Sequence, residues 1–157
     1  MSFTAVFAFV VVLPFPPPPD IQAEQSKILK SCPVLTNAEA ADALGPGTVF
    51  ASAVEATSGT VRISLLCEFV QGERTLTVTA SKTLGDKSIW ETMRKLSNGT
   101  PEPQLGDYAY SEVEDGKTHF FVVKGPLALE LRVGGKGATA ADVPKLREAA
   151  KKAVTRL

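Results

Sequence analysis

The sequence predicts an α+β fold with one antiparallel sheet of about six strands, helices packed on one face, and the element order α-βββ-α-βββ-α. Six segments have strand signals, and several of them, such as 60–70 and 74–82, alternate apolar and polar residues with the period of two that is typical of half-buried strands. These segments form two groups of three, and short turns join the members of each group. Segments typical of helices precede, separate and follow the two groups.

The first helix is predicted in "LTNAEAADALGPG", residues 35–47. Thr36 is expected to be the N-cap, and Glu39 three residues later completes a capping box. Gly45 and Pro46 then end the helix, because glycine adopts the backbone conformation that closes a helix and proline cannot continue it.

The first strand group is expected at residues 48–57, 60–70 and 74–82, and the second at 108–114, 117–123 and 127–135. In the segment 60–70, every second residue is apolar and the intervening positions are mainly polar, so that one face of the strand should be buried. The residues of that buried face are Val61, Ile63, Leu65, Cys67 and Phe69.

A second helix is predicted between the strand groups, with Asp86 as its cap and Asn98-Gly99 at its end. Its apolar face consists of Ile89, Trp90, Met93 and Leu96. The last helix is expected within residues 139–157, where an apolar stripe faces the core and a basic face is opposite. The single domain is predicted to span residues 32–157.

Residues 1–23 are predicted to be a cleaved signal peptide, followed by a linker at residues 24–31. The first fifteen residues carry no charged side chain, and their apolar core is too short to span a bilayer. The absence of Lys and Arg before that core is atypical, and a disordered tail or a buried first strand is the alternative. The expected location is therefore outside the cytosol, in the periplasm or secreted.

Cys32 and Cys67 are the only two cysteines, and in an exported domain they are predicted to form a disulfide. Free thiols remain an alternative. A lipid anchor is disfavoured because Lys30 stands where a small residue belongs, and a zinc site because too few ligands are present. We expect no metal and no cofactor.

Candidate chemistry is sparse. His119 is the single histidine, and we expect a structural role for it on a strand. Carboxylates gather between residues 101 and 115, which suggests either an acid pair or calcium site, or a solvated acidic hairpin. These carboxylates are Glu102, Asp107, Glu112, Glu114 and Asp115.

Seventeen basic and seventeen acidic side chains balance, which argues against a nucleic-acid binder. No apolar run is long enough for a transmembrane span. The basic face of the last helix is expected to be solvated, to contact an anionic surface weakly, or to pair with the acidic residues 101–115. That face carries Lys145, Arg147, Lys151, Lys152 and Arg156, and the weak contact with an anionic surface is expected through Lys145, Lys151, Lys152 and Arg156.

Several short motifs together resemble small exported bacterial proteins of unknown function, many of them lipoproteins. The motifs are "CPVLTNAEAADALG", "LLCEFV", "LGDYAY", "FVVKGPLALELRV" and "KKAVTRL", within residues 31–157. The resemblance implies a disulfide-bridged α+β fold similar to PsbP-like domains, with Cys32, Cys67, Gly106 and Gly125 as structural positions. It implies no catalytic residue, and the setting of Cys32 departs from that of the lipoprotein members.

The expected function is that of an exported, non-catalytic domain that binds a protein partner or a small apolar ligand. Trp90, Tyr108 and Tyr110 are the candidate lining of a ligand groove, because a curved sheet beneath helices often leaves a hollow. The alternative is a hydrolytic or metal-assisted enzyme that uses the acidic region 101–115.

Overall fold

The computed structural model describes residues 25–58, 61–83, 85–114 and 116–157. The segment 1–23, predicted to be a signal peptide, and Asp115 lie outside the described residues. No helix in the described part of the chain is both long enough and apolar enough to cross a membrane.

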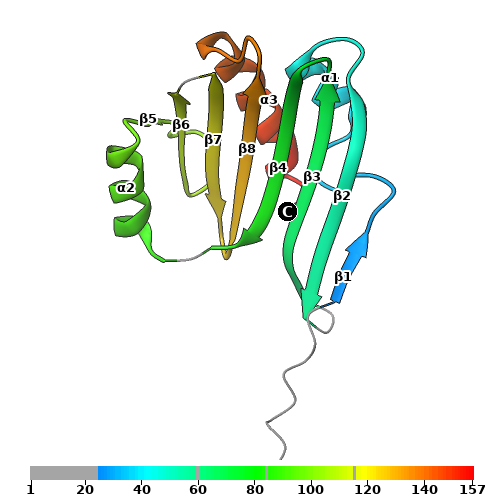
Figure 1. Cartoon of the computed structure of the whole chain (residues 1–157). Helices are drawn as coiled ribbons and strands as arrows, with labels where there is room; N and C mark the ends of the chain where they lie inside the picture. The colour runs from blue at the N-terminus through cyan, green and yellow to red at the C-terminus, as the bar shows by residue number, and fades with distance from the viewer. Residues whose placement is uncertain (1–24, 59–60, 84, 115) are drawn as a thin grey trace, which may run out of the picture.

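The molecule is built on one antiparallel sheet with the strand order β1-β2-β3-β4-β8-β7-β6-β5 (Figure 1). Each group of three predicted strands forms a meander, and the two meanders join where β4 pairs with β8. The strands are β1 Gln25–Ile28, β2 Val49–Ser58, β3 Val61–Gln71, β4 Arg74–Lys82, β5 Thr100–Pro101, β6 Tyr108–Glu114, β7 Lys117–Lys124 and β8 Leu127–Gly135.

The six predicted strands are present, but the predicted strand count and element order are incomplete. Strand β1 lies within the segment expected to be a linker and pairs with β2 before the first helix. Strand β5 is two residues long and pairs with β6. Both strands are too short to show a period of two in the sequence. Strand β1 is also separated from its partner β2 by helix α1, and β5 from its partner β6 by a loop.

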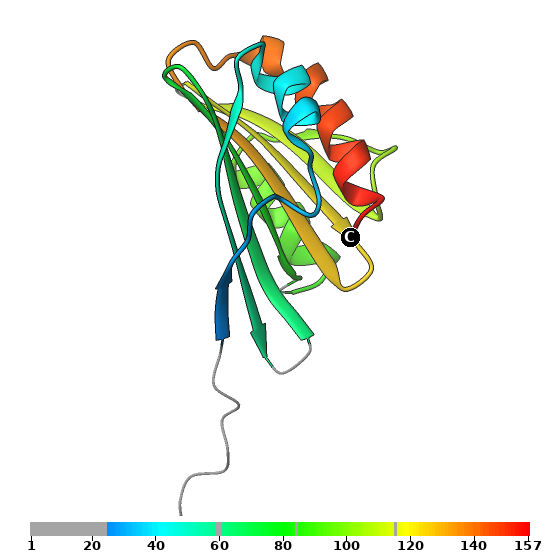
Figure 2. The same ribbon diagram turned by 90° about the vertical axis from the view of Figure 1, so that its right-hand side faces the viewer.

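Helices α1 (Asn37–Leu44) and α3 (Val143–Val154) cover one face of the sheet, and a short 3₁₀ helix, η1 (Ala140–Asp142), leads into α3 (Figure 2). We call this the covered face. The alternation predicted for β3 is confirmed for Leu65, Cys67 and Phe69, which are each at most 1% exposed, whereas Ile63 is only half-buried and the side chain of Val61 lies outside the described residues. The three buried residues join the apolar stripe of α3 in the main core, which includes Leu146, Ala149, Ala150 and Ala153.

Helix α2 (Lys87–Leu96) departs from the prediction that the helices pack on one face. It lies at the β5–β6 end of the sheet (Figure 1), and its Trp90 packs against Tyr108 in a small cluster separate from the main core. The cause is on β7, where Phe120 faces the main core and Phe121 faces the opposite side. Because β7 is apolar on both faces, it needs a partial cover on the second face, which we call the open face.

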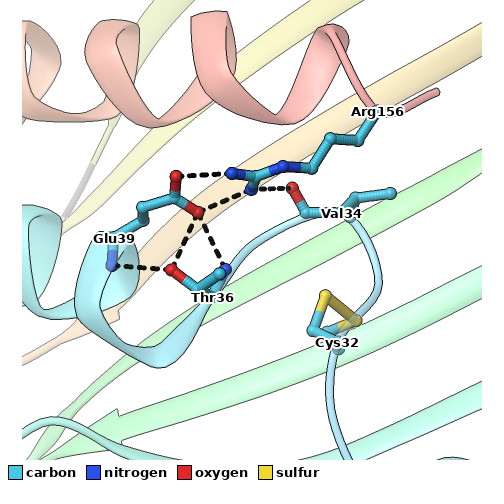
Figure 3. Close-up of a disulfide and its surroundings, with 6 residues drawn as sticks. Cys32, Val34, Thr36, Glu39 and Arg156 are labelled. Atoms are coloured by element: carbon cyan, nitrogen blue, oxygen red, sulfur yellow. Dashed lines mark hydrogen bonds and ion pairs between the residues drawn. A yellow bond between two sulfur atoms is a disulfide. The ribbon is translucent and has the colours of Figure 1, made fainter.

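The segment that enters α1 is fastened at two points (Figure 3). The predicted Cys32–Cys67 disulfide is present, with the two Cα atoms 5.7 Å apart, and it joins this segment to β3. The guanidinium of Arg156, at the end of the chain, donates to Glu39 at 2.6 and 2.7 Å and to the Val34 carbonyl at 3.2 Å. The capping box of Thr36 and Glu39 is also confirmed.

Gly106 and Gly125 both have a positive φ, which most other residues rarely adopt. At Gly106 a side chain would also collide with the backbone carbonyl of Val123. The tight approach allows the Asp107 backbone N–H to donate to that same carbonyl at 2.8 Å. These two glycines therefore shape the loop before β6 and the turn between β7 and β8.

Candidate functional site

A groove of about 500 Å³ lies between α2 and the open face of β6, β7 and β8. We call it the α2 groove. Helix α2 stands over the edge of the sheet but buries none of its residues completely, so the space beneath its C-terminal half stays open. The groove is lined by Met93, Leu96, Ser97, Tyr110, Glu112, Glu114, His119, Phe121, Glu130 and Arg132.

The floor of the α2 groove consists of two rows of side chains that cross the strands. In the first row Tyr110 of β6 is opposite Phe121 of β7, which is opposite Glu130 of β8. The second row has the same construction and contains Glu112, His119 and Arg132. Directly opposed side chains on one face of a sheet lie within contact distance, so the floor has an aromatic part beside a charged part.

The wall of the groove is apolar and exposed. Met93 is 49% exposed and Leu96 is 80% exposed, although both belong to the face of α2 that was predicted to pack. Ile89, one turn before Met93, is 49% exposed but does not line the groove. A soluble domain rarely leaves a row of large apolar side chains beside a hollow unless something covers them.

His119 lies at the centre of the charged row and is only 8% exposed. Its Nδ1 is 3.0 Å from a carboxylate oxygen of Glu112. Its Nε2 faces Glu130 at 3.5 Å, close enough for a charge contact, but within the described residues it has no hydrogen-bond partner. His119 lowers the pKa of the Glu130 carboxyl, against the opposing effect of burial, and Arg132 adds to the lowering.

Tyr110 connects the aromatic and charged parts of the floor. Its ring lies 5.3 Å from that of Phe121 and 6.2 Å from the imidazole of His119, measured between centroids. Burial raises the pKa of Tyr110 to about 12, and the negative charges of Glu112 and Glu130 contribute to the increase. The phenol therefore stays neutral near neutral pH and keeps its proton for donation.

The three aromatic residues predicted to line a groove lie in one cluster, but they differ in position. The ring centroids of Trp90 and Tyr108 are 5.8 Å apart, and those of Tyr108 and Tyr110 are 6.2 Å apart. Only Tyr110 lines the α2 groove. Tyr108 donates to Glu91 of α2 at 2.9 Å, and together with Trp90 it supports the helix.

The four carboxylates of residues 101–114 that the structure describes do not converge on one site. Glu102 is buried and accepts from Arg147 at 2.8 Å and from Ser111 at 3.0 Å, and these bonds lower its pKa. Asp107 accepts from the Gly125 backbone at 2.6 Å. Glu112 and Glu114 line the α2 groove. Within the described residues no three His, Cys, Asp or Glu side chains are grouped closely enough to hold a metal ion.

The basic face of the last helix is largely occupied by ion pairs. Lys151 lies 2.8 Å from Glu148, Lys152 lies 3.1 Å from Asp42 of α1, and Arg156 binds Glu39. The predicted pairing of the acidic region with the last helix is confirmed within the chain by the Glu102–Arg147 contact. These pairs weaken the expectation that the face attracts an anionic surface.

Sequence patterns indicated part of the α2 groove. Alternation within 108–114 places Tyr110, Glu112 and Glu114 on one face of β6, and the amphipathic pattern of α2 identifies Met93 and Leu96 as one apolar face. The contributions of Glu130 and Arg132 were missed, because they depend on the strand register.

The fold and the groove define a class: a disulfide-bridged α+β domain with one helix-covered sheet face and one largely open face. No family model, curated protein or solved structure matches the chain.

Proposed function

We propose that this chain is an exported, non-catalytic domain that binds the apolar part of a ligand in the α2 groove. The observation that carries the proposal is the exposure of Met93 and Leu96 above the aromatic floor of Tyr110 and Phe121. The groove volume, about 500 Å³, lies in the range typical of small-molecule sites.

The energetic basis is the burial of apolar surface. Each Å² of apolar surface removed from water contributes about 25 cal/mol, so a ligand that covers Met93 and Leu96 gains stabilisation without displacing any buried side chain of α2. The floor beneath is already formed by paired strands, which limits the ordering cost of binding.

Export is supported by the Cys32–Cys67 disulfide, because such bonds persist in oxidising compartments and are rare in the cytosol. The bond is part of the main core, since Cys67 is fully buried and Cys32 is 7% exposed. The apolar N-terminal segment supports the same proposal at the level of the sequence.

The first prediction concerns a substitution on the groove wall. We expect Met93→Glu in the oxidised chain to weaken binding of the neutral, apolar fluorescent probe N-phenyl-1-naphthylamine by about tenfold, because it places a charge where apolar contact is needed. Fluorescence titration measures the change. Both native side chains at positions 93 and 89 are 49% exposed, so neither substitution creates a cavity in the main core.

Ile89→Glu is the matched control, because Ile89 lies on the same helix with equal exposure but outside the groove. It should leave probe affinity unchanged. Equal loss in the two variants, or no saturable binding by the wild-type chain, would contradict a binding role for the α2 groove.

A further inference from the structure

The α2 groove is more acidic than a purely apolar ligand requires. Its lining contains three carboxylates, those of Glu112, Glu114 and Glu130, and a single guanidinium, that of Arg132. Three negative groups face one permanent positive group, or two if His119 is counted, so the lining carries a net negative charge in either case. We propose that the groove binds a small organic cation, an amine with an apolar substituent. The inference rests on the proposed function and specifies its ligand class.

The arrangement of the floor gives each part of such a ligand a counterpart. The carboxylates of Glu112 and Glu130 lie in neighbouring cross-strand rows on either side of His119. The ring of Tyr110 lies in the same row as Glu130, with its centroid 6.2 Å from that of the imidazole between the two carboxylates. An ammonium group near these carboxylates is also attracted by the adjacent aromatic rings, while its apolar substituent contacts Met93 and Leu96.

The unpartnered nitrogen of His119 points to a cation independently of the acidic residues. With Nδ1–H donating to Glu112, the neutral imidazole has only an acceptor at Nε2. In that tautomer Nε2 and the Glu130 carboxylate, 3.5 Å apart, are both acceptors, whereas in the protonated ring Nε2–H makes the charge contact that lowers the pKa of Glu130. An ammonium group between the two donates to both and satisfies them together. The Glu130 side chain is 42% exposed, so it has room to move aside for the ligand.

Other ligand charges fit less well. An anion would meet the carboxylates of Glu112, Glu114 and Glu130, with Arg132 as the only permanent positive group in the lining. Arg132 itself lies 3.9 Å from Glu130, so part of its charge is already engaged. A neutral ligand uses the wall but leaves Nε2 of His119 without a donor unless it carries a hydroxyl or amide.

The experiment compares three probes that share one apolar part: 4-phenylbutylamine, 4-phenylbutan-1-ol and 4-phenylbutyrate. Binding to the oxidised full chain is measured by NMR chemical-shift titration, with the backbone signals of β7 and α2 as reporters. We expect the amine to bind about five- to tenfold more tightly than the alcohol, the carboxylate to bind most weakly, and the preference to shrink as salt is added.

Glu130→Gln should weaken amine binding about two- to fivefold and alcohol binding clearly less, because it removes one charge and almost no volume. Glu114→Gln, at the rim, should act in the same direction. The control is Glu73→Gln, which makes the same change in net charge at a side chain that is 74% exposed and outside the groove. Arg132→Gln should strengthen amine binding.

The outcomes separate the two proposals. If the alcohol binds as tightly as the amine, or Glu73→Gln weakens amine binding as much as Glu130→Gln, the cation inference is overturned while apolar binding in the groove stands. If no probe shifts the groove signals and Met93→Glu does not affect the neutral fluorescent probe, the proposed function is overturned as well.

Discussion

Helices α1 and α2 each precede a three-stranded meander, yet they occupy opposite faces of the sheet. Helix α1 buries Ala40, Ala43 and Leu44 in the main core, and its entry is held by the disulfide and by Arg156. Helix α2 buries none of its residues fully and contacts the sheet through Trp90 and through the hydrogen bond from Tyr108 to Glu91. The first is a structural helix, and the second forms one wall of a groove.

The two meanders differ in the same way. Among the described side chains of β3, the fully buried ones lie on the covered face, and on the open face Leu66 is 40% exposed. Strand β7 has buried residues on both faces, including Phe120 on one and Phe121 on the other. The apolar residues on the open face of β7 are covered by helix α2. Because α2 covers that face only in part, a surface available for binding remains.

The largest effect is expected from removal of the disulfide. The Cys32→Ala/Cys67→Ala double variant should lose about 4 kcal/mol in free energy of unfolding, because the bond closes a loop with a sequence separation of 35 residues. Urea unfolding, followed by far-UV circular dichroism, measures this loss. Wild-type protein unfolded under reducing conditions should lose a comparable amount.

The same bond can be checked by intact mass after alkylation of native protein, in which neither thiol should react. Two reactive thiols in native protein, or a double variant as stable as the wild type, would contradict the proposal that the disulfide holds α1 more firmly than α2 is held. If the double variant remains partly folded, hydrogen exchange should increase more in α1 than in α2.

Much of the fold followed from local patterns. Strands of seven or more residues with one buried face carry their own signature, and caps such as Thr36 and Asp86 mark helix starts through their side chains. The prediction that all helices pack on one face was wrong for α2, although the sequence "HFFVV" contains the signal for cover on the second face. A continuous apolar run indicates a strand that is buried on both sides, and such a strand requires cover on both.

The site was less predictable for a different reason. Tyr110 was identified from its residue type, and His119 and Glu112 were considered separately as candidate groups. Their contact depends on the β6–β7 register, in which Glu112 is opposite His119, and Glu130 approaches from β8 only through a second register. A shift of one residue in either pairing would place these side chains on opposite faces.

The second-largest effect is expected from acid, through Glu39. Arg156 lowers the pKa of Glu39 from 4.5 to about 2 by hydrogen bonding, and Thr36 adds further bonds. Because the folded-state pKa is depressed, the stabilisation is complete above the unfolded pKa of about 4.5 and is lost as the pH falls towards about 2. Glu39→Gln should therefore be less stable than wild type near neutral pH, and the difference should disappear at low pH.

Urea midpoints measured across this pH range test the prediction, and Glu91→Gln sharpens the comparison between helices. The pKa of Glu91 is also lowered to about 2, first by Arg94 three residues later in the same helix and then by Tyr108. Loss of a mainly local contact should cost less global stability than loss of the α1–α3 contact. Equal losses in the two variants would show that α2 is held as firmly as α1.

The smallest effect is expected from Tyr108→Phe, which removes the 2.9 Å hydrogen bond to Glu91 and keeps the ring against Trp90. The loss in global stability should be about 1 kcal/mol or less, because a single partly exposed hydrogen bond contributes little. Hydrogen exchange should nevertheless become faster in α2, residues 87–96, and stay unchanged in α1, residues 37–44, since the bond connects only α2 to the sheet. Faster exchange in both helices would mean that α2 belongs to the same cooperative unit as the main core, and a groove with a loosely held wall would then be the wrong description of this face.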